Sequence, residues 1–350
     1  MKDKMMIICP GETSPLLEDM MNNPIPKDPK NLWVRKSSHL RPIQNRRFLM
    51  AVSIDSSGIN LELMAMLQTI AKGGPDYFSG SMAAVYVVGE DELFTKSIAR
   101  KIIFYLNRAG ASFVGRPVVE TTGSMKNLAH VALSRQLSLR DTCLTLSEEL
   151  LHRTLTDHPP KKENPRLLVL YSSNWNTSNT LMLWSKIKAR LQHIQIQEIH
   201  IENGSVRDCI GCPYKTCRHY GQQKRCYYGG IMITDVYPAI LSCDALLLLC
   251  PNYNDAISAN LSAVINRLTA LFRKTQFYDK YLFSLIVSGH SGSDLLAEQL
   301  ISALAINKTF RLPAHFSMME TANDPGEVLT IPGIGQRIDL FAQQIERTLL

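Results

Sequence analysis

Four of the chain's eight cysteines lie close together, at a spacing that can form a metal centre. The segment reads CIGCPYKTCRHYGQQKRC and supplies Cys209, Cys212, Cys217 and Cys226. Four thiolates so close in sequence can enclose a 4Fe-4S cluster. Zinc is the alternative metal, although structural zinc sites usually combine two close cysteine pairs, whereas eight residues separate Cys217 from Cys226. Four reduced thiols without a metal are the third alternative, and the sequence leaves all three open.

Basic residues surround these cysteines. A cluster with four thiolate ligands carries net negative charge, which nearby cations would offset. The formal net charge of the chain is +7. Basic residues are concentrated in this segment, at Arg207, Lys215, Arg218, Lys224 and Arg225. Neither half of the chain is otherwise a basic tail, so the charge pattern argues against a nucleic-acid partner.

A second polar segment could bind phosphate. The residues from Ser172 to Thr180 read SSNWNTSNT and precede a helical pattern. Backbone N–H groups at a helix start, reinforced by hydroxyl and amide side chains, can satisfy phosphate oxygens while the helix dipole favours their charge. The simpler alternative is a polar turn in which Ser178 caps the helix. No lysine stands in a Walker-type position, which argues against a nucleoside triphosphatase.

A recurring unit of strand, polar loop and helix positions these segments. The apolar run 166–171 enters the polar segment, and the helical pattern that follows has one apolar face, formed by Leu181, Trp184, Ile187 and Leu191. The runs 244–250 and 281–287 enter the loops PNYNDAIS and SGHSGSD in the same way. Three such units predict a parallel, doubly wound α/β sheet, with ligands at the carboxyl ends of its strands.

The first half of the chain contains a fainter copy of this order. Apolar runs at 46–55 and 81–89, with helices at about 60–71 and 94–106, precede their counterparts by about 200 residues. A few identities occur at that offset, among them Asn60 with Asn260. We therefore predict a duplicated fold with a degenerate N-terminal copy. Its loop GEDE at 89–92 would repel a phosphate, so this copy is expected to have lost its ligand.

The second half, about 166–350, resembles the flavodoxin-like NAD(P)H-dependent FMN reductases, including the iron-sulfur flavoproteins. The resemblance rests on four motifs in the right order: LYSSNWNTSNT in the place of the family's first loop, the cysteine segment, CPNY with the later VINRL, and VSGHSG. The chain departs from the family at Asn266, where an acid often precedes Arg267, and in the looser spacing of its cysteines.

The resemblance implies an FMN site made of three loops. It assigns the phosphate loop to Ser173, Trp175, Thr177, Ser178, Asn179 and Thr180. It places the isoalloxazine ring against Pro251, Asn252, Tyr253 and Asn254 on one side and Ser288, Gly289, His290 and Gly292 on another. A flat ring needs a flat partner and closely approaching backbone, which a tyrosine and glycines supply. The loop histidine either donates to the flavin or is simply solvated.

The implied function is an FMN-dependent oxidoreductase. It would take hydride from NAD(P)H and pass electrons to a small-molecule or protein acceptor, with a 4Fe-4S cluster as an optional carrier. No residue is assigned as catalytic, because the flavin itself performs the hydride step. The alternative from a different class is a non-enzymatic flavin electron carrier, or a redox or metal sensor based on the cysteine loop. A monomer or a homodimer is expected, since the first domain could replace a second subunit.

The predicted domains are a degenerate flavodoxin-like domain at 1–155, a linker rich in proline and charge at 156–165, and an FMN-binding domain at 166–350 with a cysteine-rich insertion at 207–228. The 350 residues are 45% apolar and 20% charged, a globular balance. No apolar run approaches the length of a membrane span, and the first apolar stretch is too short for a signal peptide. We expect a cytoplasmic protein, with Cys243 and Cys250 as core residues.

Overall fold

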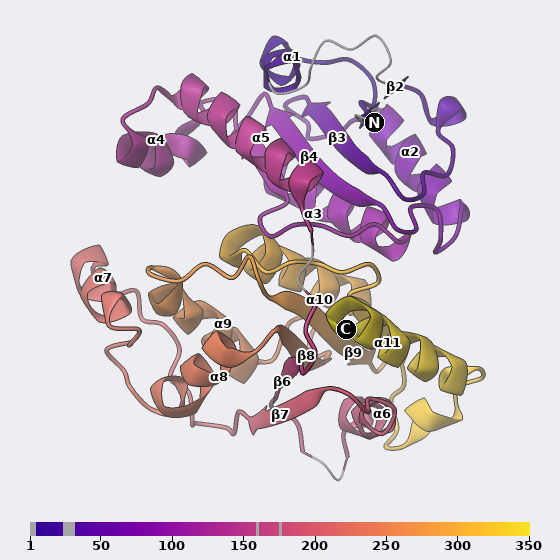
Figure 1. Ribbon diagram of the computed structural model, residues 1–350, viewed down its shortest axis with the longest axis vertical. Coiled ribbons are helices and arrows are strands. Elements are labelled where there is room, and N and C mark those ends of the chain that lie inside the picture. Colours follow the sequence, from indigo (N-terminus) through magenta and orange to yellow (C-terminus); the bar gives the residue numbers. More distant parts are fainter. Residues whose placement is uncertain (1–4, 24–31, 159–160, 175–176) are drawn as a thin grey trace. The chain divides into compact units, whose positions relative to one another are not determined.

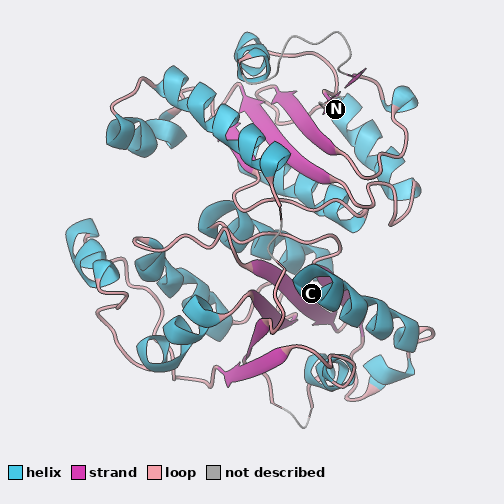
Figure 2. Cartoon of the chain, in the orientation of Figure 1, coloured by secondary structure: helices cyan, strands magenta, loops and turns pink. Residues whose placement is uncertain are grey.

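The structure is a computed structural model that describes residues 5–23, 32–158, 161–174 and 177–350. The chain divides into two compact units, Met1–His158 and Pro159–Leu350. Within the described residues, no helix has the length and apolar character needed to cross a membrane. Helices flank a sheet in each unit (Figure 2).

Each unit contains a five-stranded sheet whose described strand pairs are all parallel (Figure 1). The strand orders are β2-β1-β3-β4-β5 and β7-β6-β8-β9-β10, which both become 2-1-3-4-5 when the strands are numbered within their own unit. That order is the flavodoxin-like form of the doubly wound fold. The predicted fold class is therefore confirmed, and the occurrence of the order in both units agrees with a duplication.

The first unit has two long strands, β3 and β4, and three short ones. Its strands are β1 (Met6–Ile8), β2 (Leu32–Val34), β3 (Arg47–Ile54), β4 (Met82–Gly89) and β5 (Val118–Thr121). Its helices are α1 (Pro15–Asn22), α2 (Leu61–Lys72), α3 (Thr95–Arg108), α4 (Ala129–Arg135) and α5 (Leu139–Thr156).

The second unit has the same arrangement, with a longer connection between its second and third strands. Its strands are β6 (Arg166–Tyr171), β7 (Gln195–His200), β8 (Ala245–Pro251), β9 (Tyr281–Ser288) and β10 (Ser317–Thr321). Its helices are α6 (Asn179–Lys188), α7 (Tyr214–Gln222), α8 (Tyr237–Ser242), α9 (Ala259–Phe272), α10 (Ser293–Leu300) and α11 (Ile334–Leu349). π-helical turns at Met232–Val236 and Ile301–Ile306 adjoin α8 and α10.

Apolar side chains on both faces of the second sheet hold its helices in place. Trp184 of α6 and Phe341 of α11 belong to one buried cluster with Phe283 of β9. Full burial of a large apolar side chain contributes about 1.5–3 kcal/mol, so this layer holds α6 and α11 against the sheet. The sequence missed the outer strands β7 and β10, because half-exposed edge strands lack the continuous apolar run of an inner parallel strand.

The identities at an offset of 200 do not fall on equivalent positions. β3 begins at Arg47 and β8 at Ala245, 198 positions apart, and the same offset separates the starts of α2 and α9. Asn60 is the N-cap of α2, whereas Asn260 lies inside α9, whose N-cap is Ser258. The correspondence between the units therefore rests on the order of their elements and not on these identities.

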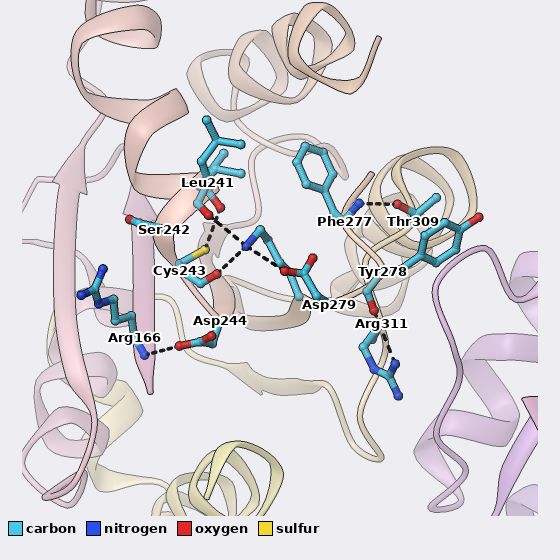
Figure 3. A network of polar contacts seen from close by, with 12 residues as sticks. Arg166, Leu241, Ser242, Cys243, Asp244, Phe277, Tyr278, Asp279, Thr309 and Arg311 are labelled. Atoms are coloured by element: carbon cyan, nitrogen blue, oxygen red, sulfur yellow. Dashed lines mark hydrogen bonds and ion pairs between the residues drawn. The ribbon is translucent and has the colours of Figure 1, made fainter. Parts of the chain in front are cut away.

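A polar network ties the amino ends of the inner strands in the second unit (Figure 3). The buried Lys280 Nζ donates to the carbonyls of Cys243 (2.7 Å) and Leu241 (3.2 Å). Asp244 Oδ2 accepts from the Arg166 backbone N–H at 2.9 Å. These contacts fasten the amino ends of β6, β8 and β9 to one another.

Candidate functional site

The loops after β6 and β8 meet at the carboxyl edge of the second sheet. These two strands are neighbours, and the strand order changes direction between them, which is where doubly wound folds bind ligands. The Ser172 and Ser258 hydroxyls lie 2.8 Å apart and join the two loops. The predicted phosphate loop therefore lies at the switch point of the sheet.

Two hydroxyls of this loop are buried and lack partners. Ser173 is 4% exposed and Thr180 is 1% exposed. Neither Ser173 Oγ nor Thr180 Oγ1 has a hydrogen-bond partner among the described residues. A buried polar group left unpaired costs about 1–3 kcal/mol, so a bound acceptor would relieve a real penalty. Thr180 lies in the first turn of α6, where orphan N–H groups and the helix dipole also favour an anion. This donor set fits a phosphate.

The side chains of Ser178 and Asn179 have structural roles instead. Ser178 Oγ accepts from Leu181 N at 3.3 Å and caps α6. The Asn179 amide donates to Asp324 O (2.8 Å) and accepts from Gly326 N (2.9 Å), which fastens α6 to the loop after β10. Both side chains are thus used within the protein, and the Ser178 backbone N–H also donates to the Asn174 carbonyl at 3.2 Å. Thr177 is exposed, and Trp175 lies outside the described residues.

The second and third predicted loops are held together by Asn252. Its Nδ2 donates to Ser291 O (2.8 Å) and Ser288 Oγ (3.1 Å), while its buried Oδ1 has no partner among the described residues. Gly292 has φ +89°, and a Cβ there would lie 2.1 Å from Asp255 Oδ1. Only glycine allows this close approach, so the structure brings the loops after β8 and β9 into direct contact.

The remaining predicted ring contacts differ in their exposure. Tyr253 is 55% exposed, and His290 is also exposed, so both rings are open to a ligand or to solvent. Pro251 ends β8. Asn254 has φ +53° and turns the chain sharply after Tyr253.

One loop of this edge was missed from the sequence. A Cβ on Gly289 would lie 3.1 Å from Asn323 Oδ1, so the loop after β10 borders the third predicted loop. The Asn323 and Asp324 backbone N–H groups both donate to Glu327 Oε2, which shapes this turn. The available signal was the polar turn TANDPG after the short run SMME, once that run is taken as an edge strand.

The four predicted metal ligands surround one cavity. Cys209, Cys212, Cys217 and Cys226 all line a volume of about 210 Å³ beside α7 and α9. This is more than ten times the roughly 10–15 Å³ that one water needs on this measure. Within the described ranges, no three histidine, cysteine or acidic side chains are close enough to hold a metal ion. The four thiols therefore border one cavity, but in the described residues they are not gathered into a metal-binding group.

The other cysteines of this unit belong to the core, as predicted. Cys243 is 3% exposed and Cys250 is fully buried. Burial raises the pKa of each thiol to about 12, so both remain protonated and unreactive at neutral pH.

The sheet order and the switch-point loop define the second unit as a flavodoxin-like domain. Residues 165–324 match the family described as NADPH-dependent FMN reductase. This match lies within the second unit and supports an NAD(P)H-dependent flavin oxidoreductase. No curated protein matches the chain by sequence.

Solved structures similar to this chain include two oxidoreductases and an azoreductase. An NAD(P)H:quinone oxidoreductase from Methanothermobacter marburgensis is 14% identical, with a TM-score of 0.41, and the match covers 52% of this chain and 98% of that one. An NADH:FMN oxidoreductase is 17% identical, with a TM-score of 0.33, over 51% and 89%. An FMN-dependent NADH-azoreductase from Bacillus anthracis is 10% identical, with a TM-score of 0.32, over 51% and 99%. The family assignment rests on the sequence match and not on these structures.

Proposed function

We propose that the second unit binds FMN at the carboxyl edge of β6, β8 and β9. The phosphate would lie on the loop 172–180 and the ring between the loops 251–254 and 288–292. The observation that carries this proposal is the pair of buried, unpartnered hydroxyls of Ser173 and Thr180. Hydrogen bonds to a charged acceptor are stronger than neutral ones, so a phosphate is the ligand that uses this pair best.

Bound FMN supplies the chemistry of accepting a hydride from NAD(P)H. The residues of the chain bind and orient it. The two hydroxyls and the start of α6 hold the phosphate, and Asn252 keeps the second and third loops in contact. Tyr253, which is half-exposed, offers an aromatic face for a ring. No side chain is assigned as a proton donor.

The test is flavin binding by the full-length protein with Ser173→Ala and Thr180→Val combined. Loss of two charge-assisted hydrogen bonds, about 1.5–3 kcal/mol each, weakens FMN binding by more than about 100-fold. Ser185→Ala is the control, because this residue on α6 is exposed and its hydroxyl donates to the Met182 carbonyl. Fluorescence titration with FMN measures both variants, and anaerobic mixing with NADH or NADPH shows which nucleotide reduces the bound flavin. Unchanged affinity in the double variant contradicts the phosphate site.

We also propose that the four cavity cysteines hold a 4Fe-4S cluster. It would supply one-electron transfer between the flavin and an electron acceptor. The support is that four thiols line a single cavity large enough for a polynuclear group. Exposed basic residues nearby, including Lys215 and Arg218, would lower the cost of its negative charge.

Anaerobic purification followed by iron, sulfide and zinc analysis tests the cluster. The wild-type protein is expected to contain iron and acid-labile sulfide, and Cys217→Ala to lose both. Cys250→Ala is the matched control, because this thiol is buried in β8 and does not border the cavity. Bound zinc without sulfide, or iron that persists in Cys217→Ala, contradicts the proposed cluster.

A further inference from the structure

Arg267 is a buried cation in the wall of the cysteine cavity. It lies on α9, is 2% exposed, and borders the same cavity as the four thiols. Its backbone is fixed, because the buried Tyr237 hydroxyl donates to the Arg267 carbonyl at 2.5 Å. Because the residue is buried, its charge is not a solvated surface charge.

The charge of Arg267 has no acidic partner in the described part of the chain. Arg267 Nη2 donates to the Gly229 carbonyl at 2.7 Å, and its buried Nε has no partner there. By contrast, Arg337 of the same unit makes two bonds to the Glu320 carboxylate, at 2.6 and 3.0 Å. A backbone carbonyl satisfies a hydrogen but does not neutralise a full charge.

The cavity itself offers the missing negative charge. An isolated buried charge is strongly unfavourable, and arginine cannot escape the penalty by losing its proton. The described residues that line the cavity include two arginines and no carboxylate. The anionic groups that this cavity can supply close to Arg267 are therefore its cysteine thiolates, in the state in which they ligate a metal group.

We infer that Arg267 is the buried counter-charge of an anionic, thiolate-ligated group in this cavity and raises the reduction potential of that group. The inference rests on the proposed 4Fe-4S cluster. One-electron reduction breaks no bond and adds one negative charge, so a fixed cation nearby stabilises the reduced form more than the oxidised form. Arg267 is thus a positioning residue that acts by charge, and it does not ligate iron.

The experiment is a spectroelectrochemical titration of the full-length protein with Arg267→Met, which keeps an unbranched, buried side chain without the charge. Without this cation, the ratio of reduced to oxidised cluster at a fixed potential is expected to fall at least tenfold. For one electron this is a shift of about 59 mV to lower potential. Iron and sulfide per chain are measured on the same samples.

Arg273→Met is the matched control. Arg273 also lines the cavity, but it is exposed and stacks over the Tyr214 ring at 4.9 Å. Solvent screens an exposed charge, so this variant is expected to shift the potential much less. Equal potentials in Arg267→Met and the wild type, or equal shifts in both variants, overturn the inference.

Arg267→Lys covers the case in which Arg267→Met assembles no cluster. Lysine keeps the charge but not the planar contact with Gly229, so iron content and potential should return toward the wild-type values. Loss of the cluster in the lysine variant as well would show a structural role and overturn the inference. A wild-type protein without iron and sulfide removes the proposed cluster itself, which distinguishes that failure from the failure of Arg267 alone.

Discussion

In the first unit, the loops at the carboxyl edge satisfy their own polar groups, whereas in the second unit the corresponding loops leave buried donors unused. Ser14 N donates to Ser53 Oγ at 2.9 Å, and the two hydroxyls bond to each other at 3.1 Å. The Asn60 amide donates to the Pro10 and Ser53 carbonyls. Ser173 and Thr180 of the second unit have no such partners among the described residues. Two sheets with the same strand order therefore differ in whether the loops at their carboxyl ends leave polar groups for a ligand. The loop sequences determine this difference.

The loops after the third and fourth strands of each sheet also differ between the two units, and again the second unit is better suited to an anionic ligand. In the first unit, the Phe94 ring lies against Gly58, where a Cβ would come within 2.4 Å of its Cγ. Hydrogen bonding from Ser124 lowers the pKa of Glu92, which therefore stays charged in the loop after β4. In the second unit, Gly292 and Asn252 hold the corresponding loops in contact without an acid at this place in the third loop. The Phe94 ring and the charged Glu92 therefore disfavour an anionic ligand in the first unit.

Ser173→Asp should produce the largest effect, because it gives the second unit an acid like those of the first. A carboxylate against the FMN phosphate adds repulsion to the loss of one hydrogen bond, and we expect binding to weaken by more than about 1,000-fold. Thr13→Asp, in the loop after β1, is the matched variant and should leave affinity unchanged. Titration with FMN measures both, and similar losses would show that both units contribute to the site.

Gly292→Ala should have the next largest effect. The left-handed backbone costs a non-glycine residue about 1–2 kcal/mol, and the added Cβ also displaces Asp255 and Asn252. We expect FMN affinity to fall about tenfold or more together with stability. Gly204→Ala isolates the backbone cost, since Gly204 has φ +78° with open space around its Cβ. If both variants bind FMN equally, the contact between the second and third loops has no part in the site.

Asn179→Ala and Asn60→Ala compare two asparagines that fasten helix starts to neighbouring loops. Each variant leaves backbone groups unpaired and should destabilise its own unit by about 1–3 kcal/mol. Hydrogen exchange resolved by mass spectrometry assigns the loss to a unit, which one global melting curve of a two-domain protein does not. We expect Asn179→Ala to weaken FMN binding modestly and Asn60→Ala to leave it unchanged. A flavin defect in Asn60→Ala would contradict this separation.

The sequence predicted the inner strands and the loops that follow them. The largely apolar runs of β6, β8 and β9 indicate burial on both faces, so their ends located three candidate loops by residue number. The family resemblance added the order of these loops. The edge strand β10 was missed because its alternating burial leaves a weak pattern, and Asn323 in the loop after it was missed for the same reason.

Contacts distant in sequence could not be predicted from motifs. Asn179 matched the phosphate-loop pattern, yet its amide bonds to residues almost 150 positions later, which only the folded chain brings near. The lack of an acidic partner for Arg267 likewise depends on every side chain around it. Motifs located the candidate residues, whereas packing decided which of their polar atoms remain free.

Phe94→Gly should have the smallest effect. It tests whether the first unit can bind FMN once the Phe94 ring is removed. Phe94 has φ +73°, so glycine removes a left-handed strain of about 1–2 kcal/mol. Because the ring is 44% exposed, its loss removes a stabilisation of about 1 kcal/mol. The two terms nearly cancel, and urea unfolding should shift by less than about 1 kcal/mol. FMN titration should still saturate at a single flavin per chain, since Glu92 and the self-bonded Ser14 remain. A second equivalent of FMN would show that Phe94 alone closes the first unit.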